Sequence, residues 1–171
     1  MAAKIEHISV AMEDVQDVRA GVRVPGGLRL HQYANLYFNA RNTMMFKRHG
    51  NHQKLGVVSI KSAILDTPGV VLSDCNAASV GFAEFGTSDE ILPKLGLTEI
   101  FAESWNHSDY YEKRRHKARM CAEVLVPRRI APEAIRGVYV SCDETQLVMQ
   151  ARHPNVKFKV NPYLFFQGPR P

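Results

Sequence analysis

The fold of this chain is decided by the stretch EKRRHKARMCAEVLV, residues 112–126. Its first half predicts the end of a helix that runs from about residue 109 to 119, with Ser108 as the N-terminal cap. Its second half contains the apolar run 121–126, which predicts a buried strand that ends at Pro127. A helix of this length that passes directly into a strand is typical of a compact fold in which short helices and strands are intermixed.

The flanking sequence continues the same alternation. Aromatic and β-branched runs predict strands at 33–39, 56–60, 70–74, 138–141 and 156–160. Short helices are expected at 42–47, capped by Asn42, from Ser88 onward, and at 143–151, with a single turn at 132–135. At least one strand follows another without a long crossover, which favours an α+β fold with a largely antiparallel or mixed sheet. No linker interrupts the pattern, so a single domain over residues 1–171 is expected.

Composition narrows the class of protein. The chain has 171 residues, 45% hydrophobic and 23% charged, as in an ordinary soluble globular protein. No apolar run approaches the roughly 20 residues that cross a bilayer, and the N-terminus does not resemble a signal peptide. Cys75, Cys121 and Cys142 are far apart and form no CxxC pair, which predicts neither a zinc site nor a disulfide framework. A reducing cytoplasm and no membrane partner are expected.

The charge balance is positive. Lys and Arg number 22 against 17 Asp and Glu, which gives a net charge of +5 and favours polyanionic partners. Much of the excess lies in residues 112–119, where Arg114, Lys117 and Arg119 form either a phosphate track or a solvated helix face. Trp105, Tyr110 and Tyr111 lie just upstream; they offer stacking faces for bases, although we expect at least two of them to pack in the core.

Glu123 is the most informative single residue, because every neighbour in residues 120–126 is apolar. A carboxylate on such a strand is paired, has a raised pKa, or lies at the end of a cleft. Two interpretations remain open: a structural ion pair with an arginine, and a catalytic group.

Arg19 and Arg23 precede a Val-Pro-Gly-Gly turn that leads to His31 and Tyr33. On an extended segment, residues two apart point to the same side, so this histidine and tyrosine either grip a nucleotide or simply follow a turn.

Other chemistries find little support in the sequence. There is no GxxxxGK[ST] or GxGxxG phosphate loop, and Cys75 has no evident activating base. His49 and His52 have no third ligand nearby, so no metal site is expected.

Four stretches, in order, resemble the DarT family, the DNA-modifying toxins of bacterial toxin–antitoxin pairs. They are QDVRAGVRVP (16–25), LHQYANLYFNARNTMMF (30–46), LSDCNAA (72–78) and KARMCAEVLV (117–126). The second is the most specific, and the similarity extends from about residue 16 to 166. This resemblance implies an ADP-ribosyltransferase-like fold, a split mixed or antiparallel sheet with short flanking helices that clasps NAD.

The resemblance also implies the activity and the site. It implies NAD-dependent ADP-ribosylation of a base in single-stranded DNA, with a macrodomain-type antitoxin as the partner that reverses the mark. Glu123 matches the family's catalytic glutamate and Arg19 its catalytic arginine. The other implied site residues are His31, Tyr33 and Tyr37 in the NAD pocket, Met44 and Asn76 on the side of the DNA base, and Lys117, with its neighbours Arg114 and Arg119, near the DNA backbone.

One part of the family pattern is missing. Members usually begin with a strand of the form YHxTH and a helix of the type NLxxIL, whose histidine helps to hold NAD. Here 18 residues precede Arg19, and residues 4–9 with His7 are a poor substitute. Either the chain is truncated or it is a reduced member with altered NAD binding. The alternative function is therefore a catalytically incomplete protein that binds nucleic acid or a partner protein without turnover.

Overall fold

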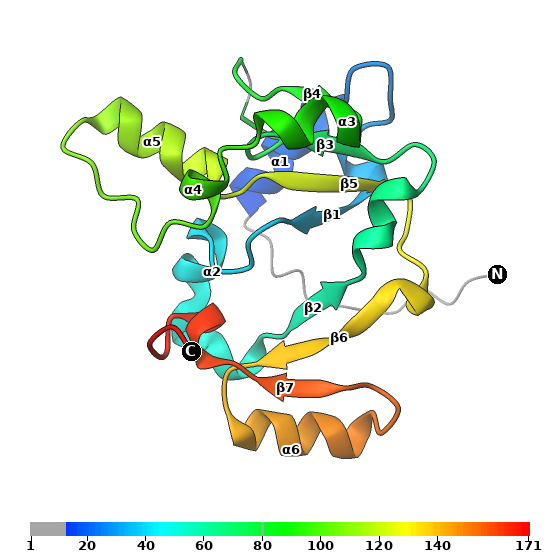
Figure 1. Ribbon diagram of the computed structural model, residues 1–171, viewed down its shortest axis with the longest axis vertical. Coiled ribbons are helices and arrows are strands. Elements are labelled where there is room, and N and C mark those ends of the chain that lie inside the picture. The colour runs from blue at the N-terminus through cyan, green and yellow to red at the C-terminus, as the bar shows by residue number, and fades with distance from the viewer. Residues whose placement is uncertain (1–12, 80) are drawn as a thin grey trace.

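The computed structural model describes residues 13–79 and 81–171. The expectations that concern residues 4–9 and His7 therefore lie outside the described residues. Within the described part, no helix is long and apolar enough to span a membrane. Two sheets lie one above the other along the longest axis of the molecule, with helices around them (Figure 1).

The larger sheet has four strands in the order β1-β5-β3-β4, and every neighbouring pair is antiparallel. Its strands are β1 (Tyr33–Tyr37), β3 (Val71–Ser73), β4 (Phe85–Gly86) and β5 (Glu123–Pro127). β5 lies between two strands and is buried from its first residue to Val126. The apolar run identified in the sequence is therefore the central strand of this sheet.

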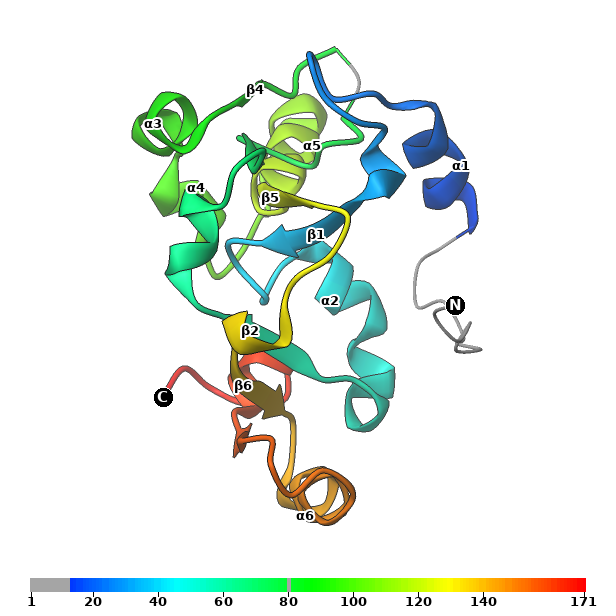
Figure 2. The same cartoon turned by 90° about the vertical axis from the view of Figure 1, so that its right-hand side faces the viewer.

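The smaller sheet has three strands in the order β2-β6-β7. Its strands are β2 (Val57–Ile60), β6 (Ile135–Val140) and β7 (Phe158–Val160). β2 and β6 are antiparallel, whereas β6 and β7 are parallel and are connected through α6 (Asp143–Arg152), as a parallel pair requires. Figure 2 shows α6 at the far end of the molecule, beside this sheet. The predicted α+β class with a split, mixed and antiparallel sheet is confirmed.

The remaining helices are short. They are α1 (Glu13–Gly21), α2 (Thr43–Arg48), α3 (Ser88–Ile91), α4 (Leu97–Ile100) and α5 (Tyr110–Arg119). Short 3₁₀ segments lie at Leu30–Gln32, His49–Lys54, Ser62–Asp66, Leu92–Lys94, Pro132–Ala134 and Pro162–Phe165. α1, α4 and β4 were not predicted from the sequence.

The helix caps test two of the sequence predictions. Asn42 caps α2 as predicted, because its side chain accepts hydrogen bonds from the Met44 and Met45 amides at 3.0 and 3.1 Å. The prediction of Ser108 as the cap of α5 is wrong. Asp109 is the cap, and its carboxylate accepts from the Glu112 amide at 2.8 Å. A carboxylate at this position also complements the positive end of the helix dipole.

The core lies on both sides of β5, because successive side chains of a strand point to opposite faces. One cluster packs α3, α4 and β3 against the face of Val124 and Val126. The other packs Val24, Leu30 and Tyr33 against Leu125. Glu123 shares the face of Leu125, so its carboxylate lies on the side of the sheet where the segment after α1 packs.

Candidate active site

The Glu123 carboxylate is held by three donors at the start of β5. Arg19 donates from both guanidinium NH₂ groups, to Oε1 at 3.1 Å and to Oε2 at 2.9 Å. The Ala77 amide donates to Oε1 at 3.0 Å. The Glu123 side chain is fully buried and Arg19 is nearly so. The two residues that the sequence singled out as catalytic, 104 positions apart, are therefore in direct contact.

Burial dominates the electrostatics of this pair. Loss of hydration raises the pKa of Glu123, and the Arg19 guanidinium and the Ala77 amide act against that shift. A carboxylate with a raised pKa is a stronger base than an ordinary one and is therefore better suited to accepting a proton. Burial and then the nearby Glu123 carboxylate also raise the pKa of Tyr37, which keeps the phenol neutral and able to donate a hydrogen bond.

The strand register places two hydroxyl groups beside Glu123. Tyr37 of β1 is its partner on one side, and Ser73 of β3 is its partner on the other. Residues in register across a sheet share a face, so the three side chains form one row. The Ser73 hydroxyl is buried and has no hydrogen-bond partner among the described residues. Such a group is costly in an empty site and is available to bond a ligand.

Asn35 completes the surroundings of Arg19. It lies on β1 two residues before Tyr37, on the same face. With its amide oriented to satisfy both ends, the nitrogen donates to the Tyr33 carbonyl at 3.1 Å and the oxygen accepts from Arg19. The Arg19 guanidinium is thus fixed by Glu123 and Asn35 together.

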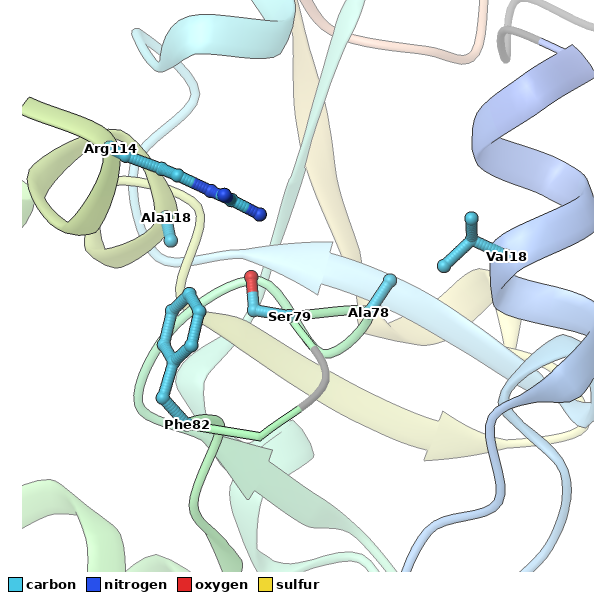
Figure 3. A pocket seen from close by; sticks show the side chains of 6 residues that line it. All are labelled: Val18, Ala78, Ser79, Phe82, Arg114 and Ala118. Carbon is cyan, nitrogen blue, oxygen red and sulfur yellow. The ribbon is translucent and has the colours of Figure 1, made fainter. Parts of the chain in front are cut away.

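A cavity of about 330 Å³ is lined by chain neighbours of this site, among them Val18, which precedes Arg19. Ala78, the neighbour of Ala77, lines it, so the cavity begins one residue away from a donor to Glu123. Figure 3 shows Arg114 reaching from α5 toward Ser79, with Val18 of α1 across the cavity. Phe82 and Ala118 complete the lining. The volume is at the lower end of the range for small-molecule sites, and its cation favours an anionic ligand.

The predicted basic track on α5 divides into two parts. Arg114 and Lys117 are exposed, and Arg114 lines the cavity. Arg119 instead forms an ion pair with Glu99 of α4. Of these three cations, Arg114 and Lys117 are therefore open to a ligand without breaking an ion pair.

The aromatic residues near α5 also differ from expectation. Tyr110 and Tyr111 are 69% and 73% exposed, so the prediction that at least two of the three aromatics pack in the core is wrong. Trp105 is partly buried and makes edge contacts with the rings of Phe46 and Phe166. The two tyrosines begin a helix whose apolar positions are few, which leaves their rings in solvent.

The structure separates His31 from Tyr33. The prediction that they point to the same side of an extended segment is wrong, because residues 30–32 form a 3₁₀ turn. His31 is exposed, whereas Tyr33 is buried in the core and its hydroxyl accepts a hydrogen bond from the Leu28 amide at 3.1 Å. Of the aromatic residues predicted for the NAD pocket, Tyr37 is the one in the row with Glu123.

Met44 and Asn76 lie on two different segments near β5. Asn76 shapes the loop that carries Ala77: its amide donates to the Ala118 carbonyl at 2.9 Å and its side chain accepts from the Ala78 amide at 2.9 Å. Met44 is in the first turn of α2, next to Thr43, whose hydroxyl lies 3.3 Å from the Cys121 sulfur. Both segments therefore contact the chain within a few residues of Glu123.

Several site groups were missed from the sequence. The Ala77 amide carries no side-chain signal, and the places of Ser73 and Asn35 depend on strand register. Asn35 had one usable signal, since its position between two tyrosines of the same strand puts it on their face.

No three His, Cys, Asp or Glu side chains converge as a metal site in residues 13–79 and 81–171. The His52 ring bonds the Ser141 hydroxyl at 2.8 Å, and the His49 ring bonds the Phe46 carbonyl.

Two relatives are similar to this chain in sequence or fold. A protein of Thermosipho africanus (strain H17ap60334), named "DNA ADP-ribosyl transferase-DNA ADP-ribosyl glycohydrolase fusion protein", is 28% identical over 174 residues, which cover 96% of this chain and 44% of the relative. The chain thus spans less than half of that protein. A solved structure, Thermosipho africanus DarTG in complex with ADP-ribose, has a TM-score of 0.80 and 24% identity, covering 94% of this chain and 43% of that one.

The other relative is a DarT of Thermus sp. 2.9. Its complex with ADP-ribosylated ssDNA has a TM-score of 0.77 and 20% identity, covering 94% of this chain and 82% of that one. Its complex with NAD+ has a TM-score of 0.71 and 18% identity, covering 86% and 80%. These similarities establish the fold.

Family membership is established at the level of sequence. The model of the family described as "ssDNA thymidine ADP-ribosyltransferase, DarT" matches residues 1–166. That match covers nearly the whole chain and confirms the resemblance found in the four sequence blocks. The chain belongs to the DarT family.

Proposed function

We propose that this chain transfers ADP-ribose from NAD to a thymidine base of single-stranded DNA. The observation that carries the proposal is the buried Glu123 carboxylate, which Arg19 clamps. Residues adjacent in the chain to its donors, Val18 and Ala78, line a cavity that holds a second arginine. The family description names this reaction, and the Thermus relative has been solved with NAD+ and with ADP-ribosylated ssDNA.

The chemistry needs a carboxylate of this kind. The bond between C1′ of the ribose and the nicotinamide nitrogen breaks, and nicotinamide leaves with the electron pair. Positive charge develops on the ribose, and the Glu123 carboxylate stabilises it electrostatically in a site with little water. A nitrogen of the base then bonds C1′ and loses its proton, which Glu123 accepts. The raised pKa of Glu123 supports that last step.

Arg19 and Arg114 divide the handling of anions. In the structure, Arg19 orients Glu123 by a two-point contact that only a planar guanidinium provides. Arg114 lines the cavity and is free of ion pairs among the described residues, so it suits the diphosphate of NAD. If Arg19 gave up one of its two bonds to Glu123 and bound the diphosphate instead, one carboxylate oxygen of Glu123 would also be free to face the ribose.

The DNA strand would approach along α5. Tyr110 and Tyr111 expose their rings, on which unpaired bases stack, and Lys117 is exposed one turn after Lys113. A base must leave its stack to reach the cavity, which favours single-stranded substrates. Met44 and Asn76 on the base side, and His31, Tyr33 and Tyr37 on the NAD side, remain predictions for the same complex.

The biological setting is part of the proposal. We propose a toxin whose antitoxin is a macrodomain-type protein, and the relative that fuses a DNA ADP-ribosyl glycohydrolase to its transferase supports this pairing. Cys75, Cys121 and Cys142 are free thiols, which supports a reducing cytoplasm. We also propose that residues 1–171 form one transferase domain.

Mass spectrometry of mixed-sequence single-stranded oligonucleotides tests the function directly. After incubation with the protein and NAD, we expect oligonucleotides that contain thymidine to gain the mass of one ADP-ribose, and fragmentation to locate it on the base. Oligonucleotides without thymidine and the RNA equivalents serve as controls. Binding of the oligonucleotides without any gain in mass would contradict the proposal and favour the binding protein without turnover.

A further inference from the structure

The second sheet carries a cationic groove that the proposed reaction does not use. Lys157 directly precedes β7 and Lys159 lies within it. The two lysines are two residues apart along the extended chain and therefore project from the same side of the sheet, whereas Phe158 between them points to the other side. Phe158 is buried and both lysines are exposed. One side of this sheet therefore belongs to the core, and the other presents charge to solvent.

The strand register defines a groove on the charged side. Ser59 of β2 pairs with Gly137 of β6, whose neighbouring amide at Val138 bonds the Lys157 carbonyl at 2.9 Å. Gly137 has no side chain, and a Cβ there would lie 2.8 Å from that carbonyl. The surface is hollowed at this glycine, with a volume of about 90 Å³. It is lined by Ser59, Arg136, Gly137, Val138, Tyr139, Lys157 and Lys159.

The charge of the groove is not neutralised by the protein. Arg136, Lys157 and Lys159 form no ion pair with any described carboxylate, and no Asp or Glu is among the lining residues. Three cations gathered around one hollow repel one another, and an anion at that point relieves the repulsion.

The size of the groove selects among anions. About 90 Å³ is well below the roughly 300 Å³ at which pockets for small molecules begin, so the groove fits phosphate groups rather than a nucleoside. The two lysines are separated by about 6.6 Å along the strand, which allows each to reach one of two neighbouring phosphates. Tyr139 adds a partly exposed ring at the edge, on which a base can stack.

We propose that this groove binds the backbone phosphates of a single-stranded nucleic acid. The proposal rests on the proposed function, because it assigns the groove to the strand whose base enters the cavity beside Glu123. The groove adds affinity that does not depend on sequence and lengthens the footprint beyond the reactive base.

The salt dependence of binding tests the groove. Fluorescence anisotropy would measure the affinity of the full chain for a labelled single-stranded oligonucleotide across a series of NaCl concentrations, without NAD. Each phosphate contact on a single strand contributes about 0.7 to the slope of log K against log salt. The double variant Lys157→Ala/Lys159→Ala should lower that slope by about 1.4 and weaken binding to every sequence alike.

Two further variants isolate the cause. Lys54→Ala/Arg152→Ala removes the same charge from exposed residues that do not line the groove, and it should leave the slope near the wild-type value. Lys157→Arg/Lys159→Arg keeps the charge and should also keep the slope. Thermal unfolding checks that all three variants are folded.

The outcomes separate the groove from the reaction. The proposed role of the groove would be overturned if the slope were unchanged in Lys157→Ala/Lys159→Ala. It would also be overturned if the slope fell equally in Lys54→Ala/Arg152→Ala. Either result would stand even if the protein modifies DNA. A fall specific to the groove variant would uphold it even if no ADP-ribose is transferred. Binding of an acidic protein segment to the groove, with an unchanged DNA slope, would also overturn the proposal.

Discussion

Glu123 shows how a charged residue is retained inside a sheet. Burial of an unpaired carboxylate costs several kcal/mol, yet this one is met by two guanidinium nitrogens and one backbone amide. These three bonds use most of the hydrogen-bonding capacity of the carboxylate. The cavity is lined by Ala78, the residue that follows its amide donor, Ala77. A purely structural ion pair would satisfy the same bonds without an adjoining cavity, so the cavity is what favours the catalytic interpretation.

Replacement of Glu123 by Gln should abolish transfer while preserving the shape of the site. Gln is nearly isosteric but neither stabilises positive charge on the ribose nor accepts the proton of the base, so we expect the rate to fall by a factor of about 100 to 1000 or more. The measurement is the rate of mass gain on a thymidine oligonucleotide at saturating NAD. Glu112→Gln, on the exposed side of α5, is the matched control and should keep the rate; a Glu123→Gln rate near that of the wild type would remove Glu123 from the reaction.

Ser73 leads to a prediction about stability. Its hydroxyl is buried and has no described partner, so Ser73→Ala removes an unsatisfied group and should raise the free energy of unfolding by about 1 kcal/mol. Ser141 is equally buried but bonds His52 at 2.8 Å, and Ser141→Ala should lower the free energy of unfolding by about 1 kcal/mol. Urea denaturation measures both values. Equal losses in the two variants would mean that Ser73 has a partner in solution.

At the scale of elements, the junction between α5 and β5 determines where the site lies. His116 of α5 is buried, and its Nε2 lies 2.9 Å from the Glu99 carbonyl, which only accepts hydrogen bonds. In the neutral imidazole, Nδ1 then accepts from His107 Nε2 at 2.8 Å. These bonds fix the middle of α5 to α4 and to the preceding loop. After α5 the chain enters β5, and Glu123 is the first residue of that strand.

The cap of α5 gives a test at this scale. Asp109→Ala removes the acceptor for the Glu112 amide, and we expect the free energy of unfolding to fall by about 1 kcal/mol. Ser108→Ala removes a side chain of similar exposure that makes no cap bond, so it should leave that free energy nearly unchanged. Thermal or urea unfolding of the two variants distinguishes them, and a larger loss in Ser108→Ala would reverse the assignment of the cap.

The elements show which features a sequence pattern can reveal. The central strand, α2 with Asn42, and α6 were predictable because apolar runs and caps are local signals. α4 and β4 have four and two residues, about one period each, and an amphipathic pattern is recognised only when it repeats over several periods. α1, with the sequence EDVQDVRAG, has too few apolar residues to mark a face. The helix that carries Arg19 was therefore not predicted, although Arg19 itself was.

The same distinction, between local sequence signals and features that depend on the tertiary fold, holds for the residues of the site. Family blocks pointed to Glu123 and Arg19, and their contact over 104 positions is a fact of the tertiary fold. Ser73 and the Ala77 amide reach Glu123 through strand register and loop geometry, which no single segment encodes. The wrong prediction for His31 and Tyr33 has a local cause, because one 3₁₀ turn changes the direction of successive side chains.

At the scale of the whole molecule, two groups of described cations line or adjoin hollows in the surface. α5 presents Arg114 and Lys117 near the cavity, and the smaller sheet presents the groove of Lys157 and Lys159. Both sets are unpaired among the described residues, whereas Arg119 is not. A net charge of +5 would attract DNA from any direction, so the distribution, rather than the total, decides the path of the strand.

The two kinds of cation on α5 should therefore respond differently to substitution. Arg114→Ala/Lys117→Ala removes two cations open to phosphates and should lower the slope of log K against log salt by about 1.4. Arg119→Ala removes a cation already engaged by Glu99, so it should change the slope much less and act mainly on stability. Anisotropy titrations over a range of salt concentrations, with thermal unfolding alongside, measure both effects. If Arg119→Ala lowers the slope as much per residue as the double variant, the ion pair opens for DNA and all of α5 binds the strand; if neither variant lowers it, α5 is a solvated helix and the strand takes another path.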